Sequence, residues 1–179
     1  SIQWQAADPN GDNMSFTLYY KGVKERTWKF LQKETEKSSY LWQTTRVPDG
    51  EYLVKLVATD SPDNPPEVAL STEEITQAFI VDNTRPKITN LTVSASGHKR
   101  ASVEGLVADE LSNISKLQYS VDAGDWIGIF PEDKIFDARE ESFRFTVEGL
   151  APGEHTIVIN AADEEGNIGS DKVLVELSD

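Results

Sequence analysis

The feature that most constrains this chain is a run of alternating residues that occurs twice. The segment Gly50–Asp60 begins Gly-Glu-Tyr and then places an aliphatic side chain at every second position. The segment Gly153–Asp163 repeats this pattern at a constant offset of 103, with His155 where the first copy has Tyr52. Apolar residues at every second position are typical of a β-strand with one buried face. We therefore expect the same strand to be present in two copies.

Shorter matches extend the repeat over most of the chain. Ala7-Asp8 matches Ala108-Asp109 at an offset of 101, and Trp28 matches Trp126 at an offset of 98. Insertions and deletions in loops produce such small drift when the strands themselves correspond. The 179 residues would give two domains of about 90 residues, close to an immunoglobulin-like sandwich. We predict domains at residues 1–84 and 85–179.

Short alternating runs separated by turn-forming residues predict an all-β fold of two tandem β-sandwiches. We expect strands in the first half at residues 2–7, 15–21, 27–31, 40–44, 51–59 and 77–81. In the second half we expect them at residues 87–94, 102–108, 116–121, 126–129, 142–147, 154–162 and 172–176. Residues 133–141 are the best candidate for one or two helical turns.

The repeat also reveals a difference between the halves. The strand predicted at residues 87–94 precedes the one that aligns with residues 2–7, and the first half has no counterpart to it. We predict that the first sandwich lacks its opening strand. An absent edge strand leaves backbone groups unpaired, so we expect a further region upstream in the same polypeptide.

Several of these segments resemble a known group of modules. Residues Trp4–Asp12, WQAADPNGD, are similar to the loop between the second and third strands of bacterial fibronectin type III-like modules. The run VDNTRP at residues 81–86 resembles the DNTPP linkers between such modules, although Arg85 replaces the commoner proline. Residues 119–126, 153–156 and 162–167 are similar to the bacterial immunoglobulin-like repeats that follow these linkers.

The resemblance implies a region of a secreted multidomain bacterial protein, outside the cell or in the periplasm or cell envelope. It implies a non-catalytic accessory, spacer or protein-docking role, because such modules occur on many unrelated proteins. The expected partners are upstream domains of the same polypeptide, and a further protein or a glycan. No cofactor is expected, with calcium as the one alternative.

Tyr52 and His155 occupy the same position in the two repeats. A tyrosine near the start of this strand forms the tyrosine corner of immunoglobulin-like sandwiches, in which its hydroxyl bonds to backbone a few residues upstream. We predict structural corner roles for both side chains. The only other histidine is His98, and an isolated histidine does not make a catalytic constellation.

The loop Asp8-Pro9-Asn10-Gly11-Asp12 places oxygen-bearing side chains at alternate positions, as calcium loops begin. Asp8, Asn10 and Asp12 are therefore candidate calcium ligands, although an EF-hand would continue to a glutamate where this chain has Tyr19. The alternative is a turn built from turn-forming residues. Calcium here would favour a rigidified adhesion segment, and a second acidic cluster could involve Asp60 and Asp82.

The tryptophans suggest a third function, carbohydrate binding through an exposed aromatic platform. Trp28 and Trp126 align with each other, so we predict that both pack in the module interiors. Trp42 has no counterpart in the second repeat and is the candidate sugar-binding residue.

Charge and motif content exclude several other classes of function. The net charge of −14 argues against nucleic-acid partners, which require basic surfaces. No apolar run reaches the length of about 18 residues that a membrane helix needs. The chain has no cysteine, and no phosphate loop, nucleophile elbow or zinc motif is present. We predict that the chain is not an enzyme.

Overall fold

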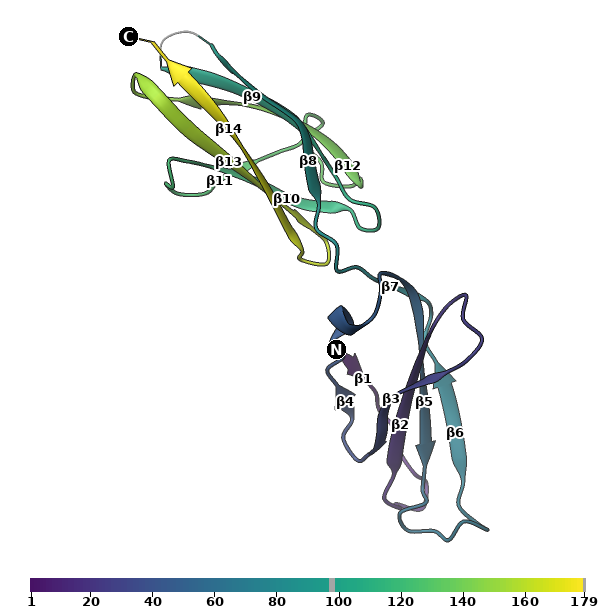
Figure 1. The fold of residues 1–179 in the computed structure, drawn as a ribbon. Coiled ribbons are helices and arrows are strands. Elements are labelled where there is room, and N and C mark those ends of the chain that lie inside the picture. Colours follow the sequence, from purple (N-terminus) through teal and green to yellow (C-terminus); the bar gives the residue numbers. More distant parts are fainter. Residues whose placement is uncertain (97–98, 179) are drawn as a thin grey trace. The chain divides into compact units, whose positions relative to one another are not determined.

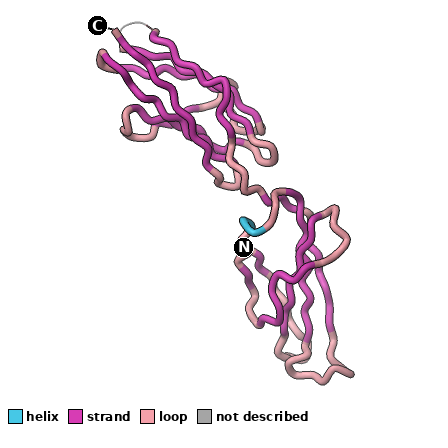
Figure 2. Tube along the Cα trace, viewed as in Figure 1, coloured by secondary structure: helices cyan, strands magenta, loops and turns pink. Residues whose placement is uncertain are grey.

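The computed structural model describes residues 1–96 and 99–178 and divides into two compact units (Figure 1). We call Ser1–Val81 the first module and Asp82–Asp179 the second module. The boundary lies before Asp82, so residues 82–84 belong to the second module. The described elements are strands, apart from one 3-10 turn at Thr44–Arg46 (Figure 2). The predicted all-β fold is confirmed; His98 lies outside the described residues.

The second module consists of two antiparallel sheets. Its described strands are β8 (Lys87–Ala95), β9 (Arg100–Ala108), β10 (Ile114–Val121), β11 (Ile127–Ile129), β12 (Glu140–Glu148), β13 (Gly153–Asp163) and β14 (Ile168–Leu177). One sheet has the order β12-β9-β8 and the other the order β11-β10-β13-β14. Such packing of two antiparallel sheets is the architecture of immunoglobulin-like sandwiches.

Side chains from both sheets fill the interior of the second module. Val103 of β9, Phe143 of β12 and Ile157 of β13 are fully or almost fully buried in one apolar cluster. Phe143 pairs with Gly105 across the β12–β9 ladder. A Cβ atom at position 105 would lie 2.7 Å from Cζ of Phe143, so a glycine is needed where this ring crosses the strand.

The first module has one larger and one smaller sheet. Its larger sheet contains β2 (Ser15–Gly22), β3 (Lys29–Thr35), β5 (Gly50–Thr59) and β6 (Ser71–Ile75) in the order β3-β2-β5-β6, and β7 (Phe79–Val81) also pairs with β5. The smaller sheet contains β1 (Ile2–Gln3) and β4 (Ser39–Tyr40). The described residues include no counterpart of β8, as predicted.

Three of the predicted elements differ from the structure, and one observed strand was not predicted. The strand predicted at residues 2–7 is reduced to β1, and that at 40–44 is replaced by β4 and the 3-10 turn. The sequence pattern missed β6, whose five residues are all exposed and do not alternate. The helical turns proposed for residues 133–141 are absent, because Lys134 has a φ of 71°, which a right-handed helix does not accommodate.

Candidate functional site

The corner predicted for Tyr52 has the expected geometry. Tyr52 is buried at the start of β5, and its hydroxyl donates a hydrogen bond of 2.7 Å to the carbonyl oxygen of Pro48. Burial raises the pKa of this hydroxyl, because the ionised form loses solvation there. The side chain is therefore used to fasten the turn that precedes β5.

His155 makes the equivalent contact in the second module. Its Nε2 lies 2.8 Å from the carbonyl oxygen of Ala151, four residues upstream, as Pro48 is from Tyr52. Its Nδ1 lies 2.6 Å from Oδ2 of Asp122. Both partners are acceptors, so the two ring nitrogens can both donate only when the imidazole is protonated.

The ion pair between His155 and Asp122 shifts both groups toward their charged forms. The hydrogen bond to Asp122 raises the pKa of His155, and the bond to Ala151 adds to this effect. In return, the bond from His155 lowers the pKa of Asp122, whose Oδ1 also accepts the Thr156 amide at 2.9 Å. One ring nitrogen contacts a backbone carbonyl and the other a carboxylate of the same module, so this histidine has no free nitrogen for acid or base catalysis.

Trp28 and Trp126 occupy unlike environments, contrary to the prediction that both pack in the interior. Trp28 is half-buried, with the ammonium groups of Lys21 and Lys55 at 5.1 and 5.3 Å from its ring. Trp126 is 47% exposed. It lies between β10 and the short strand β11, at the edge of its sheet, so the interior role predicted for Trp126 is wrong.

Trp42 is not the exposed platform that a sugar site would need. Its ring stands edge-on to those of Tyr52 and Phe79, with each pair of centroids 5.9 Å apart. It also lies 5.1 Å from the ring of Tyr20. The chain around Trp42 leaves the predicted strand and enters the 3-10 turn, which brings the half-buried indole onto the aromatic residues of the first module.

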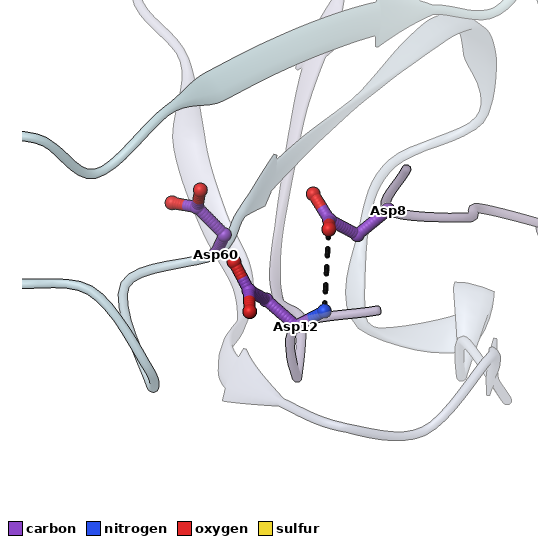
Figure 3. Close-up of side chains that lie close together, drawn as sticks. All are labelled: Asp8, Asp12 and Asp60. Carbon is purple, nitrogen blue, oxygen red and sulfur yellow. Dashed lines mark hydrogen bonds between the residues drawn. The ribbon is translucent and has the colours of Figure 1, made fainter. Parts of the chain in front are cut away.

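The acidic loop of the first module gathers three carboxylates, two of which, Asp8 and Asp12, are among the predicted ligands. Asp8, Asp12 and Asp60 each offer an oxygen within 4.8 Å of the others (Figure 3). Asp60 follows β5 and is buried, whereas Asp8 and Asp12 are partly exposed. Asp8 and Asp12 are two of the three ligands predicted for this loop, and Asp60 joins them from the end of β5.

Local hydrogen bonds hold this loop in a turn. Oδ1 of Asp8 accepts the backbone amides of Asn10 at 2.7 Å and Asp12 at 3.2 Å. Such bonds from an aspartate to the amides that follow it stabilise a turn, and Gly11 takes a φ of 83° within it. The carboxylates of Asp12 and Asp60 are also used, by Asn64 Nδ2 at 2.9 Å and the Leu70 amide at 2.7 Å.

The second module contains a corresponding cluster. Asp82, Asp109 and Asp163 are each at most 8% exposed and also offer oxygens within 4.8 Å of one another. Asp109 and Asp163 are the repeat equivalents of Asp8 and Asp60. The cluster expected from Asp60 and Asp82 is therefore replaced by two clusters, one within each module. Both clusters could have been predicted from the sequence, because each contains aspartates that align between the two repeats.

Comparisons with known proteins give likenesses of fold only. The chain is similar to the FN1–FN3 domains of chicken contactin (CNTN1), with a TM-score of 0.48 and 12% identity over 99% of this chain and 61% of that one. It is also similar to fibronectin(III)-like modules of Clostridium thermocellum CbhA, with a TM-score of 0.41 and 16% identity over 90% of this chain and 77% of that one. The chain thus spans less than two thirds of the contactin structure.

No protein-family model and no curated protein sequence matches the chain. In the part of the chain that the structure describes, no helix has the length and apolar character needed to cross a membrane.

Proposed function

We propose that this chain is a non-catalytic accessory region of a larger exported bacterial protein, in which two β-sandwich modules space neighbouring domains or dock against them. The observation that carries the proposal is that the large apolar and aromatic side chains pack inside the two modules separately. The largest apolar side chains of the second module fill its own core, and the aromatic cluster around Trp42 belongs to the first module.

Two titratable side chains of the second module, His155 and Glu141, bond to its backbone. His155 holds Ala151, and Oε1 of the buried Glu141 accepts the amides of Asp137 and Ala138 at 3.2 and 3.1 Å. A nucleophile or a general base needs a free atom that faces a substrate. These groups instead fix turns, which suits a rigid structural module.

Docking would use the edge strand β11 of the second module. Trp126, Ile127 and Phe130 are 47%, 50% and 65% exposed there, and β11 pairs on one side only, with β10. Neighbouring exposed aromatic and aliphatic residues are typical of interaction surfaces. An adjacent domain of the same polypeptide is the partner that this short apolar edge would fit.

Single-molecule pulling of the full chain from its two ends tests the spacer role. We expect two separate rupture events, each releasing roughly 25–35 nm, because an extended residue contributes about 3.3–3.6 Å. A single event of about twice that length would contradict two independent load-bearing units. Specific binding of the wild-type chain on a glycan array would also contradict the proposal and favour a carbohydrate-binding function.

A further inference from the structure

The aspartate cluster of the second module differs from an ordinary acidic surface in its burial. Asp82, Asp109 and Asp163 are only 7%, 8% and 2% exposed. They come from separate parts of the fold: Asp82 precedes β8, Asp109 follows β9, and Asp163 ends β13. Strand β9 belongs to one sheet of the sandwich and β13 to the other. The cluster therefore lies where both sheets meet the start of the module.

One oxygen in this cluster has no partner. Oδ1 of Asp109 accepts the amides of Leu111 at 2.9 Å and Ser112 at 3.2 Å. Its Oδ2 is buried and makes no hydrogen bond. A buried polar atom without a partner is costly, and the cost is larger for an oxygen of an ionised carboxylate.

The oxygens of the two neighbouring carboxylates accept bonds from nearby groups. Asp82 accepts the Thr84 amide at 2.9 Å and the hydroxyl of Ser112. Asp163 accepts the amide and the side-chain Nδ2 of Asn167 at 2.8 and 2.9 Å. These bonds hold the two carboxylates in place without supplying a positive charge.

Arg139, whose backbone carbonyl accepts the Asp109 amide at 2.8 Å, does not direct its positive charge at the cluster. The guanidinium of Arg139 donates to the carbonyl oxygen of Glu110 at 3.1 Å. None of the ion pairs found between described residues includes an aspartate of the cluster. Three carboxylates this close repel one another when ionised, and burial strengthens the repulsion.

We propose that Asp82, Asp109 and Asp163 form a binding site for a hard divalent cation such as calcium, with Oδ2 of Asp109 as a direct ligand. Calcium is bound by carboxylate oxygens at about 2.3–2.6 Å. Two ligands on opposite sides of such an ion are then roughly 5 Å apart, which accommodates oxygens within 4.8 Å of one another. The ion would join the two sheets and fasten Asp82 to them.

The first module shows why burial matters to the proposal. Asp8 and Asp60 occupy the repeat positions of Asp109 and Asp163, but Asp8 and Asp12 are partly exposed to water. Among the described residues of that module, no carboxylate oxygen is buried without a partner. The inference therefore concerns the second module alone and does not depend on the proposed spacer role.

The test is thermal unfolding of the full chain in calcium chloride, compared with the chelator EDTA. A ligand that binds the native state raises its melting temperature. For a module of about 100 residues we expect a rise of about 10 °C at a calcium concentration 100 times Kd. Sodium chloride of equal ionic strength is the control for screening. No rise with calcium up to about 10 mM, or an equal rise with sodium chloride, would overturn the proposal.

Two matched variants locate the effect. Asp109→Asn should lose at least about tenfold in calcium affinity, because it removes a charged ligand, and in EDTA it should melt no lower than the wild type. Asp125→Asn removes the same charge from an exposed loop position and should keep the full response. A full calcium response in Asp109→Asn would overturn the assignment.

Amide NMR of the wild-type chain keeps the test decisive if Asp109→Asn does not fold. Addition of calcium chloride should shift the amide signals of Leu111, Ser112 and Asn167, which bond directly to the cluster. Shifts confined to Asn10, Asp12 and Leu70, which bond to the first module's cluster, would place the cation elsewhere and refute the inference.

Discussion

The two modules share a strand plan but differ in how completely they bury their interiors. Among the described residues, fourteen hydrophobic residues are buried in the second module and six in the first. The second module closes its core with the three-stranded sheet β12-β9-β8, whereas the first has only β1 and β4 on that side. In the first module, Nε1 of Trp4 is also buried without a hydrogen-bond partner. The comparison indicates that the two-stranded sheet β1–β4 covers the interior of the first module less completely than three full strands cover that of the second.

The largest loss of stability is expected from a cavity in the core of the second module, which is the more completely buried of the two. Phe143→Ala should destabilise the second module by about 3–5 kcal/mol, because the ring is almost fully buried. Phe16→Ala in the first module should cost less, because the interior around Phe16 is less closed. Urea unfolding measures both losses. An equal or larger loss from Phe16→Ala would remove the difference between the modules.

The corner hydroxyl of the first module should have the next largest effect. Tyr52→Phe should destabilise that module by about 1–3 kcal/mol, since it leaves the Pro48 carbonyl without its donor. The second module's transition in the same urea experiment serves as the internal control. A loss near zero would show that the hydroxyl does not fasten the turn.

The corner of the second module should respond to pH where the first does not. The pKa of His155 is raised above its usual value of about 6.5, so its stabilising effect is complete below that pH. It is lost as pH rises through the folded-state pKa. The pKa of Asp122 is lowered, so its contribution is lost only as pH falls through a value below about 3.8.

The expected result is a melting temperature of the second module that decreases as pH is raised from about 6 to about 9. His155→Tyr, which copies the corner of the first module, should reduce this decrease. Scanning calorimetry at several pH values measures both proteins. An identical pH dependence in the wild type and the variant would show that His155 does not cause the decrease in melting temperature.

The smallest effects concern the two aligned tryptophans. Trp28→Ala should cost about 1 kcal/mol, because the indole loses its contacts with Lys21 and Lys55. Trp126→Ala should change stability by less than about 0.5 kcal/mol, as is usual for exposed positions. Thermal or urea unfolding followed by far-ultraviolet circular dichroism, which reports on the backbone, measures the stability of both variants. Equal losses would restore the prediction that the two rings have the same role.

The repeated order of strands and both corners could be predicted from the sequence. They depend on local patterns such as those of Gly50–Asp60 and Gly153–Asp163. The sequence was insufficient for β6, whose side chains are all exposed and whose position is set by backbone pairing with β5. The environments of Trp42 and Trp126 also depend on the path of irregular segments. The aspartate clusters join residues far apart in the chain, and the aligned pairs Asp8 with Asp109 and Asp60 with Asp163 were the sequence signal for them.

The central claim is that the same sandwich plan is present twice, with two separate interiors. Residue-resolved urea unfolding followed by amide NMR tests it most directly. We expect the signals of Leu18 and Val54 to disappear together at a lower urea concentration than those of Val103 and Ile157. Loss of all four signals in one shared transition would mean a single cooperative core and would contradict the claim.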